Sequence, residues 1–382
     1  MSKKKVAIVG AGNAACITAL SYHLEGRVKT DHLDKIQIYY DPNTPIERVG
    51  QGTTPPVAKL ISQLLYNYFA PGKNNKIKAT LKSGVMYENW GKNTPAHFHP
   101  FIMPNGACHY SPHLLSERTL KSGFFEVIEK RIDDPESEID ADMIWDCRGK
   151  HERDDSLYRK LINPLNSAIL ANKKGVDPTH LYTRSVATPN GWTFVIPTLD
   201  GASYGYLYND TITSKERAEK NFIELFDVVP DGHLKFDNYM VKNVFQGERT
   251  VLNGNKMCFI EPLEATSTGF YHVVGGAVWN ILFYPDRKQK ENCNAWIQRD
   301  IDRIQNFILR HYSSGSKYNT PFWRYAKKLA ENTWQRDVEY LQIMKASSKI
   351  SSEKLWEIEI NNNIPDYSQW SATSLHNWEE IV

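Results

Sequence analysis

The first stretch of the chain constrains its fold more than any other. Residues 5–15 read KVAIVGAGNAA, so four apolar residues lead directly into a glycine turn. A short apolar run that ends in glycines is typical of a buried parallel strand, and the residues after the turn have the composition of a helix. A second apolar run, residues 36–40, ends at Asp41. The sequence therefore predicts a β-α-β unit over residues 1–41.

The glycine turn has the spacing of a dinucleotide-binding site. Gly10 would make the tight turn, and Gly12 would let a pyrophosphate approach the helix N-terminus. Ala15 stands where a small residue packs the helix against the strand. Asp41 follows Gly12 by 29 residues, which is further than the usual ~20 but still suits a ribose carboxylate. A glycine turn in an ordinary α/β unit is the alternative interpretation.

Length, charge and cysteine usage exclude several classes of protein. The 382 residues suffice for two domains that share a large core, and the net charge of +2 gives no strong attraction to nucleic acid or anionic membrane. We find no apolar stretch of membrane-spanning length and no Cys/His cluster with zinc-ligand spacing. The five cysteines are scattered and odd in number, which predicts reduced thiols, a cytoplasmic location and no metal site.

Local patterns predict the remaining elements. A single strand is expected over residues 78–90, with Lys82 on the same face as Met86 and Glu88. Residues 96–110, which are rich in His and aromatic residues, are expected to form a loop. Antiparallel strands at 193–196 and 204–208 predict a second, β-rich layer, and a strand at 143–145 predicts a return to the first sheet. Helices are expected over residues 57–69, 112–121, 215–226, 266–283, 291–311 and 321–330.

Four later segments hold candidate functional residues. They are ATLK at 79–82 followed by YENW at 87–90, HPF at 99–101, GWTFVIP at 191–197, and FIEPLEATST at 259–268. Each has an ordinary interpretation when taken alone. Lysines on strands are mostly solvated, large aromatic residues fill cores, and a carboxylate is favourable in the first turn of any helix. A lone histidine in a loop is usually neither a ligand nor a catalyst.

Taken in order with the glycine turn, these segments resemble the flavin-dependent halogenases of the tryptophan-halogenase type. The resemblance runs from about residue 5 to 325 and rests on the family patterns A-T-F-K…F-x-N-W, H-P-F, W-x-W-x-I-P and E-P-L-E-S-T-[GS]. The chain departs from the family in two places near the flavin. Phe194 replaces the second tryptophan of W-x-W, and residues 50–54 read GQGTT where the family has G-x-G-E-A-T.

The resemblance implies an α/β fold. It would contain an FAD-binding Rossmann-like domain of the GR2/PHBH flavin-monooxygenase type, interleaved with a β-rich substrate layer at about 80–130 and 165–250. This core would span residues 1–320, and residues 321–382 would form a reduced helical cap. Only 59 residues follow Trp323, whereas tryptophan halogenases continue much further, and this brevity is similar to that of short, virus-encoded members of the family.

The resemblance also implies an activity. FADH₂ would come from a separate NAD(P)H-dependent flavin reductase, since no second glycine motif for NAD(P)H is visible. O₂ and a halide ion (chloride, bromide or iodide) would give hypohalous acid at the flavin, which would pass to Lys82 and Glu264 for electrophilic halogenation of a small aromatic substrate. The residues implied are Lys82 and Glu264 for catalysis; His99 and Phe101 for substrate; Thr266 and Ser267 for halide; and Gly10, Gly12, Asn13, Ala14, Ala15, Asp41, Gly50, Trp192, Pro197 and Thr268 for FAD.

Two alternative functions remain open at this point. A flavin-dependent aromatic monooxygenase would turn over without halide and would not need Lys82. A non-catalytic FAD-binding module would bind the flavin and oxidise nothing. The sequence does not determine the substrate, the regiochemistry, the preferred halide or the oligomeric state, and a homo-oligomer is compatible with it.

Overall fold

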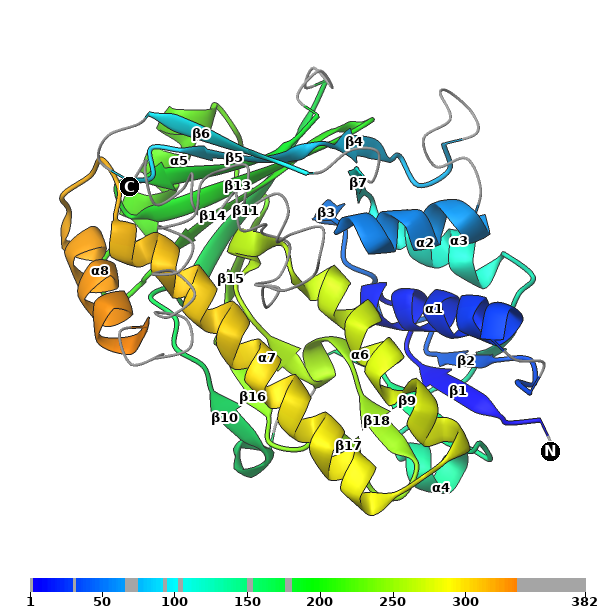
Figure 1. Ribbon diagram of the computed structural model, residues 1–382. Coiled ribbons are helices and arrows are strands. Elements are labelled where there is room, and N and C mark those ends of the chain that lie inside the picture. The colour runs from blue at the N-terminus through cyan, green and yellow to red at the C-terminus, as the bar shows by residue number, and fades with distance from the viewer. Residues whose placement is uncertain are drawn as a thin grey trace, which may run out of the picture.

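The computed structural model describes residues 3–29, 32–65, 75–91, 95–101, 106–149, 154–175 and 181–334. Figure 1 shows two sheets, a mostly parallel one near the N-terminus and a large, mostly antiparallel one at the opposite end of the molecule. The long helix α7 (Arg287–Ser314) runs diagonally across the molecule and ends near α8 (Pro321–Trp334). The mixed α/β fold class expected from the sequence is confirmed.

The parallel sheet is built around the glycine turn. Its central strand β1 (Val6–Val9) is buried along its whole length, as expected for a strand covered on both faces. It pairs in parallel with β2 (Gln37–Tyr40) and with β9 (Met143–Asp146), so both the β-α-β unit and the return of the chain are present. Gly10 has φ +122°, and a Cβ there would lie 3.0 Å from the carbonyl oxygen of Cys147. Only glycine therefore suits this turn.

The order of strands in the parallel sheet is β17-β18-β9-β1-β2-β8. Its outer members are β8 (Glu126–Glu129), β17 (Phe245–Gln246) and β18 (Thr250–Leu252). These three strands come from segments that the sequence assigned to the β-rich layer. The two layers are thus interleaved in the chain, and the domain boundaries proposed from the sequence stay a prediction.

The second layer is a seven-stranded sheet of order β15-β11-β14-β13-β12-β5-β6. Strands β13 and β14 pair antiparallel along their full lengths, which confirms the two strands expected there. The strands are β5 (Gly84–Glu88), β6 (Ala96–Pro100), β11 (Ser167–Lys174), β12 (Thr183–Thr188), β13 (Gly191–Thr198), β14 (Gly201–Tyr208) and β15 (Gly232–Lys235). The remaining strands of the described chain form two small sheets, of order β3-β7-β4 and β10-β16-β19. These strands are β3 (Gln51–Gly52), β4 (Thr80–Lys82), β7 (Ala107–Tyr110), β10 (Tyr158–Lys160), β16 (Tyr239–Val241) and β19 (Cys258–Phe259).

The single strand expected over residues 78–90 was wrong, because the chain changes sheets inside it. Strand β4 pairs with β7, whereas β5 pairs with β6 and β12. The buried positions shift by one across Ser83, so Lys82 faces the interior while Met86 and Glu88 are only half-buried. Lys82 therefore does not share their face.

The loop expected over residues 96–110 was also wrong. Residues 96–100 form β6 and residues 107–110 form β7, each held by an antiparallel neighbour. Proline, asparagine and glycine lower the strand signal of this segment, and pairing with β5 and β4 overrides that local preference. Residues 102–105 lie outside the described part of the chain.

The helices agree with the sequence pattern, apart from small shifts at their ends. Helix α7 begins after Asp286, whose carboxylate accepts a hydrogen bond from the Gln289 amide at 2.8 Å, and it ends at Gly315. The other helices are α1 (Asn13–Lys29), α2 (Pro55–Leu65), α3 (Pro112–Leu120), α4 (Pro135–Glu138), α5 (Lys215–Phe226) and α6 (Ser267–Phe283), with a 3₁₀ turn η4 (Pro262–Glu264) before α6. The part of the expected 57–69 helix after residue 65, and the cap beyond residue 334, lie outside the described residues.

Among the described residues, no helix combines the length and the apolar character needed to cross a membrane.

Candidate active site

A large cavity lies at the carboxyl ends of the central parallel strands. Its volume is about 1290 Å³, which exceeds the range of roughly 300–1,000 Å³ typical of drug-sized ligands and suits a dinucleotide. The residues expected to bind FAD that line it are Gly10, Gly12, Asn13, Ala14, Asp41, Gly50 and Thr268. The glycine turn, the end of β2 and the start of α6 thus meet around one space.

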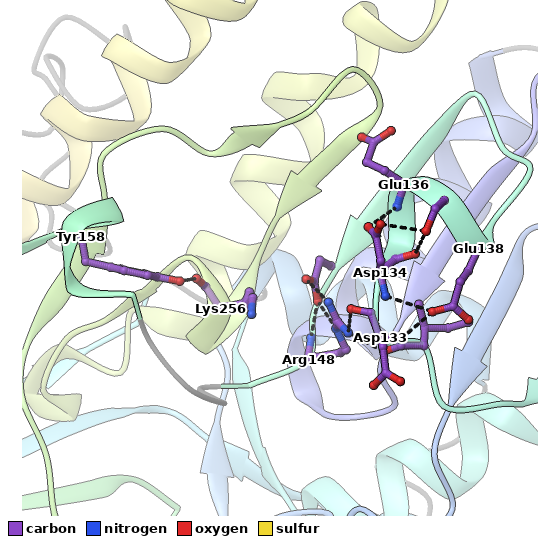
Figure 2. Close-up of polar contacts among 10 residues, drawn as sticks. Asp133, Asp134, Glu136, Glu138, Arg148, Tyr158 and Lys256 are labelled. Atoms are coloured by element: carbon purple, nitrogen blue, oxygen red, sulfur yellow. Dashed lines mark hydrogen bonds and ion pairs between the residues drawn. The ribbon is translucent and has the colours of Figure 1, made fainter.

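The wall of the cavity that includes Arg148 is stabilised by a network of hydrogen bonds and ion pairs, shown in Figure 2. Arg148 lines the cavity and forms a two-point ion pair with Asp146, through Nε at 2.9 Å and Nη2 at 2.8 Å. The same guanidinium donates to the carbonyl oxygens of Ile132 and Asp133, and Glu138 accepts from the Asp133 amide at 2.8 Å. The charge of Arg148 is therefore balanced by its neighbours, and the side chain supports the wall.

Three residues expected to contact FAD do not line this cavity. Ala15 is buried in α1, Trp192 packs 6.4 Å from the ring of Trp90, and the carbonyl oxygen of Pro197 accepts a 2.8 Å hydrogen bond from Thr80. From β13 the cavity is lined instead by Phe194 and by Ile196. Direct FAD contact by Ala15, Trp192 and Pro197 stays a prediction.

The N-terminus of α6 opens beside the cavity. Ser267 and Thr268 line it, and the side chain of Thr266, at the N-cap position, does not cap the helix. The hydroxyl of Thr266 is buried without a hydrogen-bond partner in the described structure. Unpaired amides at a helix N-terminus carry a partial positive charge, so this corner suits an anion.

A strap of residues Gly50–Thr54 separates the cavity from Lys82. Gly50 and Gln51 line the cavity on one side, and the Lys82 amine donates to the carbonyl oxygen of Thr53 at 3.3 Å on the other. The strap is fixed to α6, because the hydroxyl of Thr268 donates to the Gly52 carbonyl at 3.1 Å. The lysine thus touches the back of the segment that forms the cavity wall.

Lys82 is fully buried, and burial governs its protonation. Desolvation lowers the pKa of Lys82 from 10.5 to about 8, although the nearby charge of Glu264 works in the opposite direction. Burial also lowers the pKa of His99, to about 4, and that of His109. The lysine can therefore exchange a proton near neutral pH, while the two imidazoles stay neutral.

Tyr87 and His311 both approach one carboxylate oxygen of Glu264. The Tyr87 hydroxyl donates to Oε1 at 2.6 Å, and Nε2 of His311 lies 2.8 Å from the same oxygen. Neither Tyr87 nor His311 was expected in the site from its residue pattern. A histidine three to four residues from the C-terminal end of an amphipathic helix gives no local signal of this contact, since only tertiary packing brings α7 to η4.

The two residues expected at the substrate also lie beside Lys82. The Phe101 ring centroid is 5.1 Å from the lysine Nζ, and His99 meets the Phe101 ring edge-on at 5.8 Å between centroids. Both side chains are buried. The structure thus brings Lys82, His99 and Phe101 together, with Glu264 close enough to influence the pKa values of both Lys82 and His99.

A second buried carboxyl lies three residues before Glu264. The Tyr312 hydroxyl contacts both oxygens of Glu261, at 2.8 and 2.9 Å, and burial raises the pKa of Glu261 to about 8. Adjacent residues of α7, His311 and Tyr312, therefore reach Glu264 and Glu261 respectively.

Other kinds of site find no support in the described part of the chain. It contains no cluster of three or more His, Cys, Asp or Glu side chains suited to a metal ion. All five cysteines fall within it, and each is a free thiol.

Curated relatives of the chain are tryptophan halogenases. Tryptophan 7-halogenase RebH of Lentzea aerocolonigenes is 27% identical over 212 residues, which cover 50% of this chain and 39% of RebH. Tryptophan 6-halogenase ThaL of Streptomyces albogriseolus is 30% identical over 165 residues, which cover 41% of this chain and 30% of ThaL. The matched part is less than half of the length of either relative.

The fold is that of solved flavin-dependent halogenases. The structure of a tryptophan halogenase from Shewanella frigidimarina NCIMB 400 superimposes with a TM-score of 0.75 at 17% identity, covering 98% of this chain and 87% of that one. A family model described as tryptophan halogenase matches residues 5–121 and 120–360. Because these matches cover most of the sequence, the chain belongs to the tryptophan halogenase family.

Proposed function

We propose that the protein is an FADH₂-dependent halogenase that acts on a small, electron-rich aromatic substrate. The observation that carries this proposal is the position of Lys82, whose fully buried amine lies directly behind the strap that walls the dinucleotide-sized cavity. A buried lysine is rare, and this one has an aromatic ring beside it and a buried carboxylate close enough to raise its pKa. A hydroxylase or a passive flavin-binding module has no use for that amine.

The cavity would hold FAD along the parallel strands. Gly10, Gly12, Asn13 and Ala14 would bind the pyrophosphate at the N-terminus of α1, and Asp41 would accept hydrogen bonds from a ribose. We assign the flavin end to the region of Gly50, Phe194 and Thr268, with Trp192 and Pro197 supporting β13 from behind and Ala15 allowing the helix to pack closely. When bound and reduced, FAD supplies the two-electron chemistry that turns O₂ and halide into hypohalous acid.

The N-terminus of α6 would hold the halide. The amides at Thr266 and Ser267 and the unpartnered Thr266 hydroxyl are donors without a competing side-chain cap. A helix N-terminus stabilises an anion by dipole and by hydrogen bonds together. Ser267 also lines the cavity, so the halide would lie next to the flavin end.

Lys82 would receive the hypohalous acid and present it to the substrate. Since the pKa of Lys82 is about 8, both the ammonium and the amine form are accessible near neutral pH, for a hydrogen bond or for a direct bond to the halogen. Glu264 would accept the proton that leaves the ring when aromaticity is restored. Phe101 would stack on the substrate ring, and neutral His99 would line the same pocket.

The test supplies the purified protein with FAD, a separate NAD(P)H-dependent flavin reductase and chloride, bromide or iodide in turn. Products from a panel of phenols and indoles are identified by mass spectrometry. We expect halogenated products from the wild type and none from Lys82→Ala, while Lys82→Ala still binds FAD. Lys76→Ala, at an exposed lysine nearby, is the matched control and should keep full activity.

Other outcomes would reject the proposal. Halide-independent hydroxylation would indicate the monooxygenase alternative, and FAD binding without any product would indicate the non-catalytic alternative. Full turnover by Lys82→Ala would remove the assigned mechanism. The separate reductase and a cytoplasmic location, where five free thiols stay reduced, are part of the same proposal.

A further inference from the structure

One basic side chain in the wall of the dinucleotide-sized cavity has no counter-ion. Among the described residues, the basic ones that line the cavity are Lys130, Arg131, Arg148 and Lys256. The first three form ion pairs: Lys130 with Glu138 at 2.9 Å, Arg131 with Asp133 at 3.0 Å, and Arg148 with Asp146 at 2.8 Å. In the part of the chain that the structure describes, the side chain of Lys256 takes part in no ion pair and no hydrogen bond.

The segment that carries Lys256 leaves the parallel sheet at the same edge as the glycine turn. Lys256 ends a 3₁₀ turn, η3 (Gly254–Lys256), which follows β18 in the chain. Strand β18 runs parallel to β9, and β9 runs parallel to β1, so the carboxyl ends of all three strands meet at one edge. In open α/β sheets, ligands bind in the crevice outside these carboxyl ends.

The same turn also packs against the N-terminus of α1. A Cβ atom at Gly254 would lie 2.4 Å from the Cβ atom of Ala14, in the first turn of that helix. The preceding residue, Asn253, donates from its side-chain amide to the Thr18 hydroxyl at 3.0 Å, so the segment is fixed to α1 at a second point. Lys256 therefore lies in the cavity wall next to the helix N-terminus that follows the glycine turn.

Two tyrosine hydroxyls hold the peptide groups at the end of η3. Tyr158 on β10 donates to the carbonyl oxygen of Lys256 at 2.7 Å (Figure 2), and Tyr239 on β16 donates to the carbonyl oxygen of Asn255 at 2.7 Å. The backbone is thus held in place before any ligand binds. The half-buried side chain of Lys256 has a flexible four-carbon stem, with which its ammonium group can reach a ligand in the cavity.

The glycine turn by itself does not balance the charge of a pyrophosphate. Both phosphates of a dinucleotide are negatively charged, whereas a helix N-terminus contributes only about +0.5 elementary charge. Residues 10–16 read GAGNAAC, so this segment contains no basic side chain. Lysine binds phosphate as a point charge with three hydrogen-bond donors. The ammonium group of Lys256 therefore has the charge and the donors that the segment lacks.

We propose that Lys256 binds the pyrophosphate of FAD and supplies the side-chain cation that the glycine turn lacks. The inference rests on the proposed function, since it requires FAD in this cavity. Lys256 would act on the retention of the cofactor and not on the chemistry at the flavin end. Because FAD and FADH₂ have the same pyrophosphate, Lys256 should hold both redox forms equally well.

The first test measures FAD affinity by fluorescence titration. We expect Lys256→Met to weaken FAD binding by about tenfold or more, as loss of one charge-assisted hydrogen bond implies. Lys256→Arg keeps the charge and should stay close to wild type. With potassium acetate as the salt, FAD affinity should fall less steeply in Lys256→Met than in wild type, because salt screens the lost charge pair. The FAD-free proteins should unfold at the same temperature.

Lys130→Met is the matched control. It removes the same charge from the lining of the same cavity, but from a lysine that already has Glu138 as its counter-ion. We expect its FAD affinity to stay close to wild type. An equal loss in Lys130→Met and Lys256→Met would show a general effect of cavity charge, and it would overturn the assignment of a specific contact.

The second test separates binding from catalysis. In Lys256→Met the apparent KM for FADH₂ should rise by the same factor as the Kd for FAD, while kcat for halogenation stays unchanged at saturating flavin. Unchanged FAD affinity, or a lower kcat with unchanged KM, would overturn the inference and leave the proposed function intact. A wild type that binds FAD but yields no halogenated product would reject the proposed function and leave the assignment of Lys256 standing.

Discussion

Gly205 on β14 lies directly opposite Phe194 on β13, and a Cβ atom at Gly205 would lie 2.2 Å from two atoms of the Phe194 ring. The ring occupies the space that any other residue at position 205 would need. Since Phe194 lines the cavity, this close contact determines how far its ring extends into that cavity.

We therefore expect Gly205→Ala to push the Phe194 ring into the cavity. Overpacking of this kind typically destabilises a protein by about 1–3 kcal/mol, and FAD affinity should fall by about tenfold or more. Fluorescence titration with FAD and thermal unfolding measure the two effects. The double variant Gly205→Ala, Phe194→Leu should recover both, and equal loss in the single and double variants would contradict the explanation.

Burial of Lys82 should reduce the stability of the protein at neutral pH. In the unfolded chain the amine stays protonated up to about pH 10.5, but in the folded protein its pKa is about 8. The unfolded state thus binds more protons between these values, and the stability of the wild type should rise with pH from 8 to 10.5. This difference corresponds to about 3 kcal/mol.

At pH 7, Lys82→Met should accordingly have a free energy of unfolding in urea that is higher than that of the wild type by up to about 3 kcal/mol. Its advantage should shrink as the pH approaches 10.5, since the wild-type amine is then neutral in both states. Urea titrations at pH 7, 8.5 and 10 give the comparison. Lys76→Met, at an exposed site, should stay within about 0.5 kcal/mol of wild type at every pH, and a destabilised Lys82→Met at pH 7 would contradict the prediction.

Glu261 should give a pH dependence of the opposite sign. Its pKa is raised from 4.5 to about 8 in the folded protein, so the folded state binds more protons in that window. The stability that Glu261 contributes through its raised pKa is fully present below pH 4.5 and is lost as the pH rises through about 8. Glu261→Gln, which cannot ionise, should match the wild type near pH 5 and exceed its stability at pH 9 by a few kcal/mol. Parallel pH profiles of the two proteins would show that Glu261 ionises normally.

A negative charge at the start of α6 should weaken halide binding without destabilising the helix. Ser267→Asp places a carboxylate at the helix N-terminus, where the dipole stabilises it by about 0.3–1 kcal/mol. The same charge should repel the halide, so we expect the apparent KM for bromide or chloride to rise by about tenfold or more, with unchanged or improved thermal stability. Ser267→Asn is the neutral control of equal size. An unchanged halide KM in Ser267→Asp would place the halide elsewhere.

The sequence predicted the parts of this molecule that depend on local signals. The apolar run and glycines of residues 6–12 gave the strand, the turn and the helix, because their spacing alone determines that geometry. The helices α5 and α6 were expected almost to the residue. Antiparallel pairing of β13 with β14 followed from two aromatic strands close in the chain.

Features that depend on tertiary pairing were missed. Ser83 marks a change of sheet that no local pattern reveals, so the face of Lys82 was assigned wrongly. The strands β6 and β7 exist because of their neighbours and not because of their composition. The partners of Glu264, at positions 87 and 311, are separated from it by long stretches of chain, and hydrogen-bond geometry between such positions is not encoded in any short motif.

The last turns of α7 contact the segment of residues 261–264 at two points, through His311 and Tyr312. Neighbouring residues on an α-helix project about 100° apart. Both contacts therefore form only when α7 has one particular rotation about its helix axis. Lengthening or shortening α7 by one residue between Asp286 and His311 would turn both side chains away from the two glutamates at once. Variation in this helix is therefore constrained to substitutions between Asp286 and His311.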